Sequence, residues 1–232
     1  MKSFYDETRA NLFDQWVGEK QALLAVELGV GESVLDVGCG IGQFTPLFLK
    51  KFKRVVGLDP NPEYLNEARG DVEYVIGYGE TFNFEEKFDT ISMNNLLEHV
   101  DDPVVLLQNC KKHLNKDGII IVQVPNSNSI ARRLGVLMGI IPSIDHISDK
   151  ERSVYGHKRT YTLESLEKDV KSAGLNVQKK GGLLWKPLPN EMLLKLCEHN
   201  TSEWRDNFIN TLIRFGEDRP DECAQIYIAA GL

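Results

Sequence analysis

The chain has 232 residues, 42% of them hydrophobic and 26% charged, which is enough to bury a full core and is the composition of an ordinary soluble globular protein. Its formal net charge of −7 disfavours binding to nucleic acid backbones, so small-molecule chemistry fits better. No apolar run approaches the length of a membrane span, the first residues lack the core of a signal peptide, and four scattered cysteines show no metal-ligand spacing. We therefore expect a cytoplasmic protein without nucleic acid partner, membrane span or metal, as a monomer or homodimer.

Helical and strand patterns alternate through the first half of the chain. Apolar residues at helical spacing cover about residues 6–30, and a short apolar strand follows at 33–37. The next predicted elements are helix 43–52, strand 54–58, helix 61–69, strand 73–76, strand 88–93, helix 103–114 and strand 118–124. Alternation of this kind implies βαβ units, a parallel sheet covered on both faces, and right-handed connections.

The regular pattern lapses after Pro125 and returns where Thr162 can cap a helix that ends near Gly174. A strand at 175–180, a mostly helical stretch at about 189–215 and a last strand at 223–230 complete the pattern. We interpret the chain as a single domain with three embellishments, which are an N-terminal helical segment at 1–30 and lid or substrate insertions at 126–160 and 186–220.

The most informative motif follows the strand at 33–37, where residues 33–42 read SVLDVGCGIG. Gly38, Gly40 and Gly42 let the backbone turn sharply and bring its N–H groups against a ligand. A loop built for pyrophosphate surrounds that anion with N–H groups and a helix N-terminus, whereas the carboxylate of Asp36 would repel it. A cationic ligand is favoured instead, and S-adenosylmethionine carries both a sulfonium and an ammonium group.

A second apolar strand, RVVGLD at 54–59, ends in Asp59, at the distance where an acid accepts hydrogen bonds from ribose hydroxyls. VLDVGCGIG together with GLDPN at 57–61 resembles the class I S-adenosylmethionine-dependent methyltransferases, in particular the ubiquinone-biosynthesis-like group that acts on small molecules. The resemblance covers about residues 30–126 with specific motifs and 155–232 loosely. It implies a Rossmann-like three-layer α/β sandwich with a mostly parallel seven-stranded sheet, an antiparallel C-terminal hairpin and helical lid insertions.

The same resemblance implies which residues contact the cofactor, S-adenosyl-L-methionine, and its product S-adenosyl-L-homocysteine. Tyr78 departs from the family pattern, because relatives have an acid there that faces the adenine ring. Ligands bind beyond the carboxyl ends of the strands in such sheets, which puts the end of the strand at 88–93 near the methionine group. The expected cofactor contacts are Asp36, Gly38, Cys39, Gly40, Gly42, Asp59, Pro60, Gly79, Glu80 and Asn94.

A base is needed only if the acceptor must lose a proton. His99 is the first candidate because imidazole titrates near neutrality, and His157 and His146 follow. The alternative is that Glu98 and His99 only brace the loop and cap the next helix.

The segment 126–160 is locally basic within an acidic chain. Guanidinium groups clamp phosphate or carboxylate well, which favours an anionic acceptor held by Arg132, Arg152 and Arg159, with Tyr155 beside them. A solvated loop with scattered charges is the alternative interpretation.

These residues together predict S-adenosylmethionine-dependent methyl transfer to an oxygen or nitrogen of a small molecule. Two alternatives stay open, a non-catalytic S-adenosylmethionine-binding protein and an NAD(P)-dependent oxidoreductase. The second is disfavoured by Asp36, and by Gln43 where the third glycine of the dinucleotide motif would fall.

Overall fold

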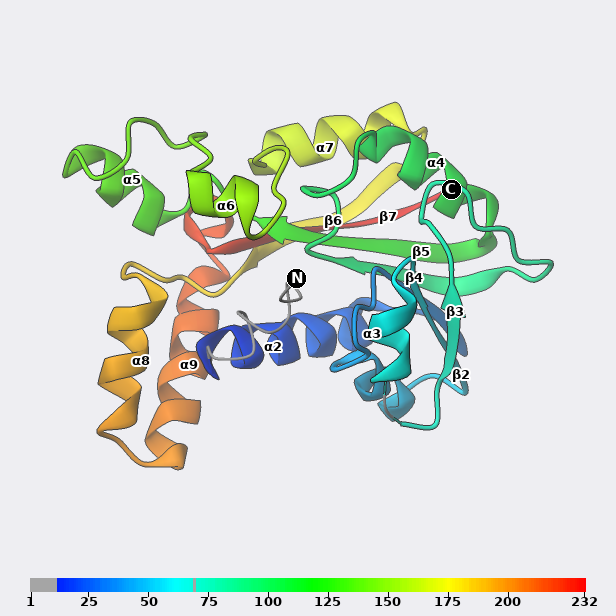
Figure 1. Cartoon of the computed structure of the whole chain (residues 1–232), viewed down its shortest axis with the longest axis horizontal. Helices are drawn as coiled ribbons and strands as arrows, with labels where there is room; N and C mark the ends of the chain where they lie inside the picture. The colour runs from blue at the N-terminus through cyan, green and yellow to red at the C-terminus, as the bar shows by residue number, and fades with distance from the viewer. Residues whose placement is uncertain (1–11, 69) are drawn as a thin grey trace.

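The computed structural model describes residues 12–68 and 70–232 and contains a seven-stranded sheet with helices on both faces (Figure 1). The strand order is β3-β2-β1-β4-β5-β7-β6, so the order reverses between β1 and β4. Neighbours among β1 to β5 are parallel, whereas β7 is antiparallel to both β5 and β6, which confirms the expected sheet. The strands are β1 Ser33–Val37, β2 Arg54–Asp59, β3 Glu73–Ile76, β4 Phe88–Asn94, β5 Leu114–Pro125, β6 Asn176–Leu183 and β7 Gln225–Gly231.

The helices of the first half are shorter than predicted. The helix expected at 43–52 is a 3-10 helix, η1, which buries only Thr45 and Phe48, at the three-residue spacing that suits this tighter helix. The helix expected at 61–69 ends at Asn66 and buries no residue, so little packing supports its extension. The helices are α2 Leu12–Leu28, η1 Thr45–Lys50, α3 Pro62–Asn66, α4 Pro103–Lys112, α5 Ile130–Leu137, α6 Asp149–Ser153, α7 Leu163–Ser172, α8 Asn190–Glu198, α9 Ser202–Gly216 and η2 Pro220–Glu222.

Other boundaries stay close to the prediction. Thr162 caps α7 through a capping box, as expected, and β5 begins at Leu114, four residues before the expected start. Residues 6–11 of the predicted N-terminal helix and position 69 lie outside the described residues. Within the described ranges, no helix is both long and apolar enough to cross a bilayer.

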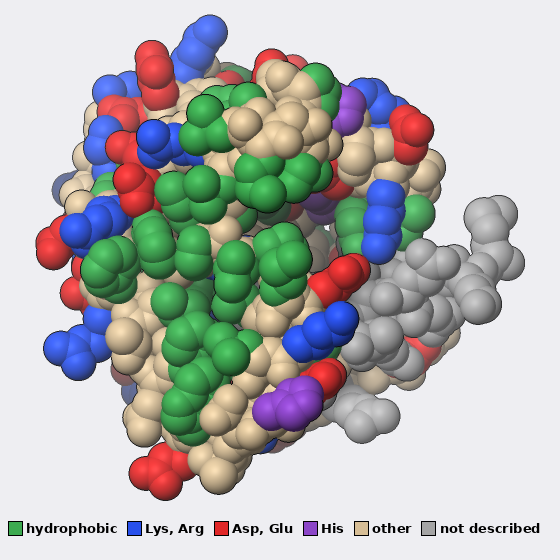
Figure 2. All heavy atoms as spheres, turned by 90° about the vertical axis from the view of Figure 1, so that its left-hand side faces the viewer, with side chains coloured by type: hydrophobic (Ala, Val, Ile, Leu, Met, Phe, Trp, Pro, Cys, Tyr) green, Lys and Arg blue, Asp and Glu red, His purple; other side chains and the backbone are tan. Residues whose placement is uncertain are grey.

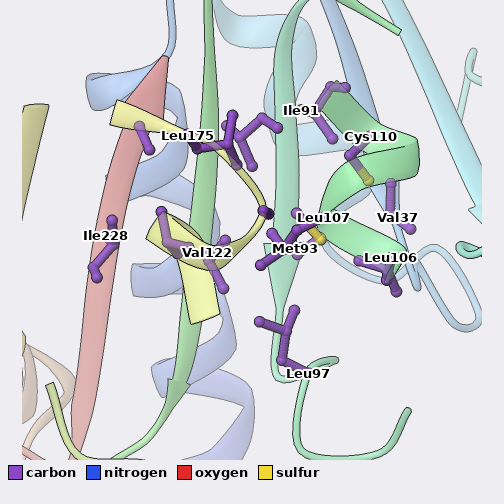
Figure 3. Close-up of a cluster of buried hydrophobic side chains, with 14 of the residues drawn as sticks. Val37, Ile91, Met93, Leu97, Leu106, Leu107, Cys110, Val122, Leu175 and Ile228 are labelled. Carbon is purple, nitrogen blue, oxygen red and sulfur yellow. The ribbon is translucent and has the colours of Figure 1, made fainter. Parts of the chain in front are cut away.

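Successive side chains of a strand face opposite sides of the sheet, and this alternation divides the core in two. Leu35 and Val37 of β1 belong to the larger cluster, which packs against α4 and α7 (Figure 3). Val34 belongs to the second cluster, with Ala25 of α2 and Phe48 of η1. A third cluster joins α2, α8 and α9 beside the end of β6.

The second face of the sheet becomes polar at the carboxyl ends of its central strands. Asp36 lies between Leu35 and Val37 and therefore faces α2 and η1, where it is bonded to Thr45. Asn94 of β4 pairs in register with Gln123 of β5. This polar end of the sheet, beside α2, is where a ligand site is expected in an open α/β fold.

The junction of β5 and β7 provides a test of the fold. The buried Asn126 side chain donates hydrogen bonds to the carbonyls of Asp221 (2.9 Å) and Cys223 (2.8 Å). Asn126→Leu keeps the volume but leaves these carbonyls without their donor, so we expect a loss of about 2–4 kcal/mol in the free energy of unfolding in urea. Asn176→Leu removes a comparable bond at an exposed position and should cost less than about 0.5 kcal/mol. Equal losses in the two variants would contradict the argument.

Candidate functional site

Two cavities lie side by side at the carboxyl ends of β1, β2 and β4. The first has a volume of about 390 Å³ and many polar residues in its wall, and we call it the polar cavity. The second, of about 290 Å³, is walled largely by apolar side chains, such as those of Leu58 and Leu106, and we call it the apolar cavity. Both are lined by Gly38 and His99, so they form the two halves of one elongated site.

The glycine turn shapes the junction of the two halves. Gly38 has a φ of +76°, and a Cβ there would lie 2.9 Å from Leu96 Cδ1, so both the conformation and the space require glycine. The N–H groups of Gly38 and Cys39 donate to the carbonyl of Leu58, and that of Gly40 donates to Asp59 Oδ2 at 2.9 Å. The N–H of Gly42 also bonds within the turn, to the Cys39 carbonyl. The expectation that the N–H groups of the three glycines point at a ligand is therefore wrong, because they hold the turn together and against β2.

This arrangement is poorly suited to pyrophosphate. A dinucleotide site needs outward N–H groups and the positive end of a helix, but the turn donates inward and is followed only by η1.

Asp36 supplies a carboxylate to the wall of the polar cavity. Its side chain is buried, and its Oδ2 accepts a hydrogen bond from Thr45 Oγ1 at 2.7 Å. Burial raises the pKa of Asp36 to about 6, an effect that the Thr45 bond partly offsets. A cation beside this group would favour its charged form.

Asp59 is buried but lines neither cavity. Its two oxygens accept the backbone N–H groups of Gly40 and Asn61, each at 2.9 Å. It thus braces the glycine turn against the start of α3, and its contact with a ribose stays a prediction.

Glu98, His99 and His157 meet at the wall of the polar cavity. Glu98 Oε1 lies 3.7 Å from His99 Nε2, and the rings of His99 and His157 are 4.9 Å apart in an edge-to-face arrangement. Burial raises the pKa of Glu98 to about 8 and lowers that of His99 to about 4, so near neutrality the pair is chiefly uncharged. One ligand atom from each residue lies within 4.8 Å of the others, so this group has the donors and spacing to hold a metal ion, which the sequence did not predict.

Side-chain amides join α2 to the ends of β4 and β5. The Gln21 and Asn95 side chains exchange hydrogen bonds of 3.3 and 3.1 Å, and Gln123 Nε2 donates to the Gln21 carbonyl and to Asn94 Oδ1. Asn95 has a φ of +51°, a conformation that costs energy outside glycine and persists only where the surroundings fix it. The amide network thereby sets the shape of the polar wall.

The structure brings most of the predicted cofactor residues to the two cavities. Those on the polar cavity are Asp36, Gly38, Cys39 and Asn94, and those on the apolar cavity are Gly38, Pro60, Gly79 and Glu80. Gly40, Gly42 and Asp59 line neither cavity.

The predicted catalytic and substrate residues are divided. His99, Tyr155 and His157 line the polar cavity, whereas His146 and the three arginines do not. Arg132 donates to the carbonyls of Ile144 and His146 and pairs with Glu151 at 3.0 Å. Arg159 donates to three carbonyls of the loop after β4, and Arg152 is exposed. The guanidinium groups of Arg132 and Arg159 therefore hold the protein's own loops.

The insertions also leave apolar side chains on the surface. The side chains of Leu137, Met138 and Ile140, at and just beyond the end of α5, are 83%, 71% and 69% exposed and lie outside the core. Figure 2 shows hydrophobic side chains gathered on this side of the molecule, which carries α5 and α8.

Three cavity residues were missed or undervalued by the sequence analysis. Glu98 was weighed only as a loop brace, and Gln21 and Gln225 were not considered. A polar Gln21 inside an apolar helical pattern is a usable signal, since it indicates a helix that packs over a polar region. Nothing in the local sequence distinguishes Gln225.

Comparison with known proteins gives a consistent result. A family profile described as a methyltransferase domain matches residues 5–180. The ubiquinone biosynthesis O-methyltransferase of Actinobacillus pleuropneumoniae serotype 7 (strain AP76) is 34% identical over 120 residues, which are 46% of this chain and 51% of that protein. The mitochondrial ubiquinone biosynthesis O-methyltransferase of Homo sapiens is 29% identical over 175 residues, 68% of this chain and 45% of that protein. The chain thus spans about half the length of these curated relatives.

Solved structures share the fold. A Thermotoga maritima protein described as a SAM-dependent methyltransferase and possible histamine N-methyltransferase superposes with a TM-score of 0.66 at 22% identity, covering 98% of this chain and 94% of that one. At this identity the similarity concerns architecture alone.

The contacts of Arg159 yield a prediction that separates loop bracing from ligand binding. Arg159→Ala leaves the carbonyls of Leu97, Val100 and Asp101 without their charged donor, so we expect unfolding free energy to fall by about 2–4 kcal/mol. Arg152→Ala, at an exposed position, should change it by less than about 0.5 kcal/mol. Urea denaturation measures both, and an unchanged stability in Arg159→Ala would return this residue to the substrate candidates.

Proposed function

The chain belongs to the methyltransferase domain family, and we propose that it transfers the methyl group of S-adenosylmethionine to an oxygen or nitrogen of a small-molecule acceptor. The family profile covers most of the chain. The curated relatives that the chain matches are named as O-methyltransferases. The product of the donor would be S-adenosylhomocysteine.

The elongated site suits this cofactor. The apolar half, walled by Leu58, Leu106 and the turn at residues 77–80, fits an adenine ring. The polar half, with Asp36 and the ends of β4 and β5, fits the charged methionine group and leaves room for an acceptor. Gly38 and His99 at the junction would lie near the middle of the bound molecule.

One observation carries the proposal, which is that the segment around the glycine turn presents a carboxyl group, and not backbone N–H groups, to the cavity. The N–H groups of Gly38, Cys39 and Gly40 donate hydrogen bonds to other atoms of the protein. The carboxyl group of Asp36 lines the cavity. Such a wall attracts a sulfonium or ammonium group and repels a pyrophosphate. It also disfavours the NAD(P)-dependent alternative, while a non-catalytic S-adenosylmethionine-binding protein remains the rival to test.

The bound donor supplies an activated methyl group on a sulfonium leaving group. The protein's part is to hold the acceptor in line with that methyl group and to exclude water, and the amide network of Gln21 and Asn95 would fix the shape of the wall that does so. Where the acceptor must lose a proton, His99 and His157 are the bases we propose, because both rings line the polar cavity. Burial lowers both pKa values, which leaves the rings neutral and able to accept a proton but makes them weaker bases. His146, away from the cavity, is the weakest of the three candidates.

The acceptor and the setting of the reaction are also proposals. The names of the curated relatives favour an oxygen nucleophile, whereas the Thermotoga maritima protein is described as a possible histamine N-methyltransferase. We propose a small molecule as the partner, a cytoplasmic location and a monomer or homodimer.

Ligand binding provides the direct test of the cofactor. Calorimetry of the purified chain should give micromolar affinity for S-adenosylmethionine and S-adenosylhomocysteine, about 8 kcal/mol of binding free energy, and no heat with NAD. Radiolabelled methyl transfer to a panel of phenols and amines then distinguishes an enzyme from a binding protein. Tight NAD binding without S-adenosylmethionine binding would refute the proposal.

The pH dependence of S-adenosylmethionine affinity tests Asp36. A bound cation stabilises the ionised form of Asp36. Below pH about 6 the free protein carries a proton on Asp36, which binding of the cation must release. The affinity should therefore fall by up to ~10-fold per pH unit below that pH. Above that pH the contribution of Asp36 should level off. Asp36→Asn should bind more weakly at about pH 8 and should lose this part of the pH dependence. A slope that is identical in the variant would assign the proton to another group.

A further inference from the structure

The polar cavity has an unusual balance of charge and hydrogen-bonding groups. Its wall includes two carboxyl groups, those of Asp36 and Glu98, and no lysine or arginine among the described residues. The nearby Arg132 and Arg159 are bonded to backbone carbonyls, and Lys158 pairs with Asp101. A phosphate or carboxylate in this cavity would therefore find no cationic side chain in the wall.

Several oxygen atoms of the site have no hydrogen-bond partner. Among the described residues, the buried side-chain polar atoms without one are both carboxyl oxygens of Glu98 and the amide oxygens of Gln123 and Gln225. Glu98 is only 2% exposed, and both Glu98 and Gln225 line the polar cavity. Each buried acceptor left unsatisfied costs about 1–3 kcal/mol, which a ligand that donates hydrogen bonds would recover.

Four donor side chains of the same wall already have acceptors within the protein. Gln21 and Asn95 donate to each other, Asn94 donates to Ser92 Oγ, and Thr45 donates to Asp36. Carboxyl and amide oxygens accept hydrogen bonds, so the unpartnered oxygens of Glu98 and Gln225 favour a ligand that donates them.

We propose that Glu98 and Gln225 select a methyl acceptor that presents O–H or N–H donors and carries no anionic group, such as a polyhydroxy or amino compound. This inference rests on the proposed methyl transfer and names the substrate class of that site. It replaces the anionic acceptor that the basic segment 126–160 suggested, because the arginines of that segment lie outside the cavity.

The test uses the full chain saturated with S-adenosylhomocysteine, which fills the donor site without turnover. Binding of three matched aromatic probes is measured by calorimetry and by competition, namely catechol, dopamine and 3,4-dihydroxybenzoate, together with a wider panel of amines, alcohols, carboxylates and phosphates of similar size. We expect donor-bearing neutral or cationic compounds to bind at least ~10-fold more tightly than anionic ones. Preferential binding of anionic compounds, or no binding by any donor-bearing compound, would overturn the proposal.

Variants connect the selectivity to the two residues. Glu98→Leu and Gln225→Leu should each weaken the best neutral or cationic probe by about 10-fold or more while S-adenosylhomocysteine affinity stays within about 3-fold. Glu164→Leu and Gln178→Leu, at exposed positions on α7 and β6, are the matched controls and should change neither affinity. Loss of S-adenosylhomocysteine binding in Glu98→Leu or Gln225→Leu would mean that these oxygens serve the methionine ammonium, and the proposal would fail.

A metal ion is the remaining competitor for Glu98. The measurements are therefore repeated with Mg²⁺ or Zn²⁺ and with a chelator. Binding of either ion that Glu98→Leu abolishes, with probe affinity lost on chelation, would assign the oxygens to a metal and overturn the inference. Failure of S-adenosylhomocysteine itself to bind the unmodified chain would instead refute the proposed function.

Discussion

The two-residue alternation of side chains along β1, β4 and β5 is the constraint on which the site depends. On the face toward α4 and α7 the alternating positions are apolar along the strands, as with Leu35 and Val37. On the other face the apolar series ends at the carboxyl ends, where Asp36, Asn94 and Gln123 replace it. A shift of one residue in any of these strands would move a polar side chain into the main core and an aliphatic one into the cavity. Stability of the core and chemistry of the cavity therefore fix the same register.

The loops beyond the strands are held by polar contacts rather than by burial alone. Arg159 bonds to the carbonyls of Leu97, Val100 and Asp101, which fixes the loop that carries Glu98 and His99. The backbone N–H of Lys158 donates to the Glu98 carbonyl in the same loop. The segment after α6 thus serves the site twice, since it places His157 in the cavity wall and fastens the loop opposite.

The sequence was most informative where local chemistry decides the structure. The strands at 33–37 and 73–76 have the predicted bounds, and Asp36 and Gly38 lie in the cavity wall as their motif indicated. The helix expected at 43–52 was overestimated, because η1 buries only Thr45 and Phe48, at the three-residue spacing of a 3-10 helix.

Properties that depend on distant parts of the chain could not be read in this way. The sequence does not show whether Arg159 binds an anionic ligand or braces a loop. The answer depends on whether the folded loop places its backbone carbonyls beside the guanidinium group, as it does here. The roles of Gln21 and Gln225 depend on how α2 crosses the sheet and where β7 begins, and neither follows from local pattern.

Helix α2 precedes the whole sheet in the chain, yet it forms part of the cavity wall through Gly18 and Gln21. Docking of this helix and occupancy of the cavity are consequently linked equilibria, because a molecule that touches the wall is bound only while the helix is seated. The earliest described element is therefore also the one whose attachment the cofactor and acceptor would reinforce.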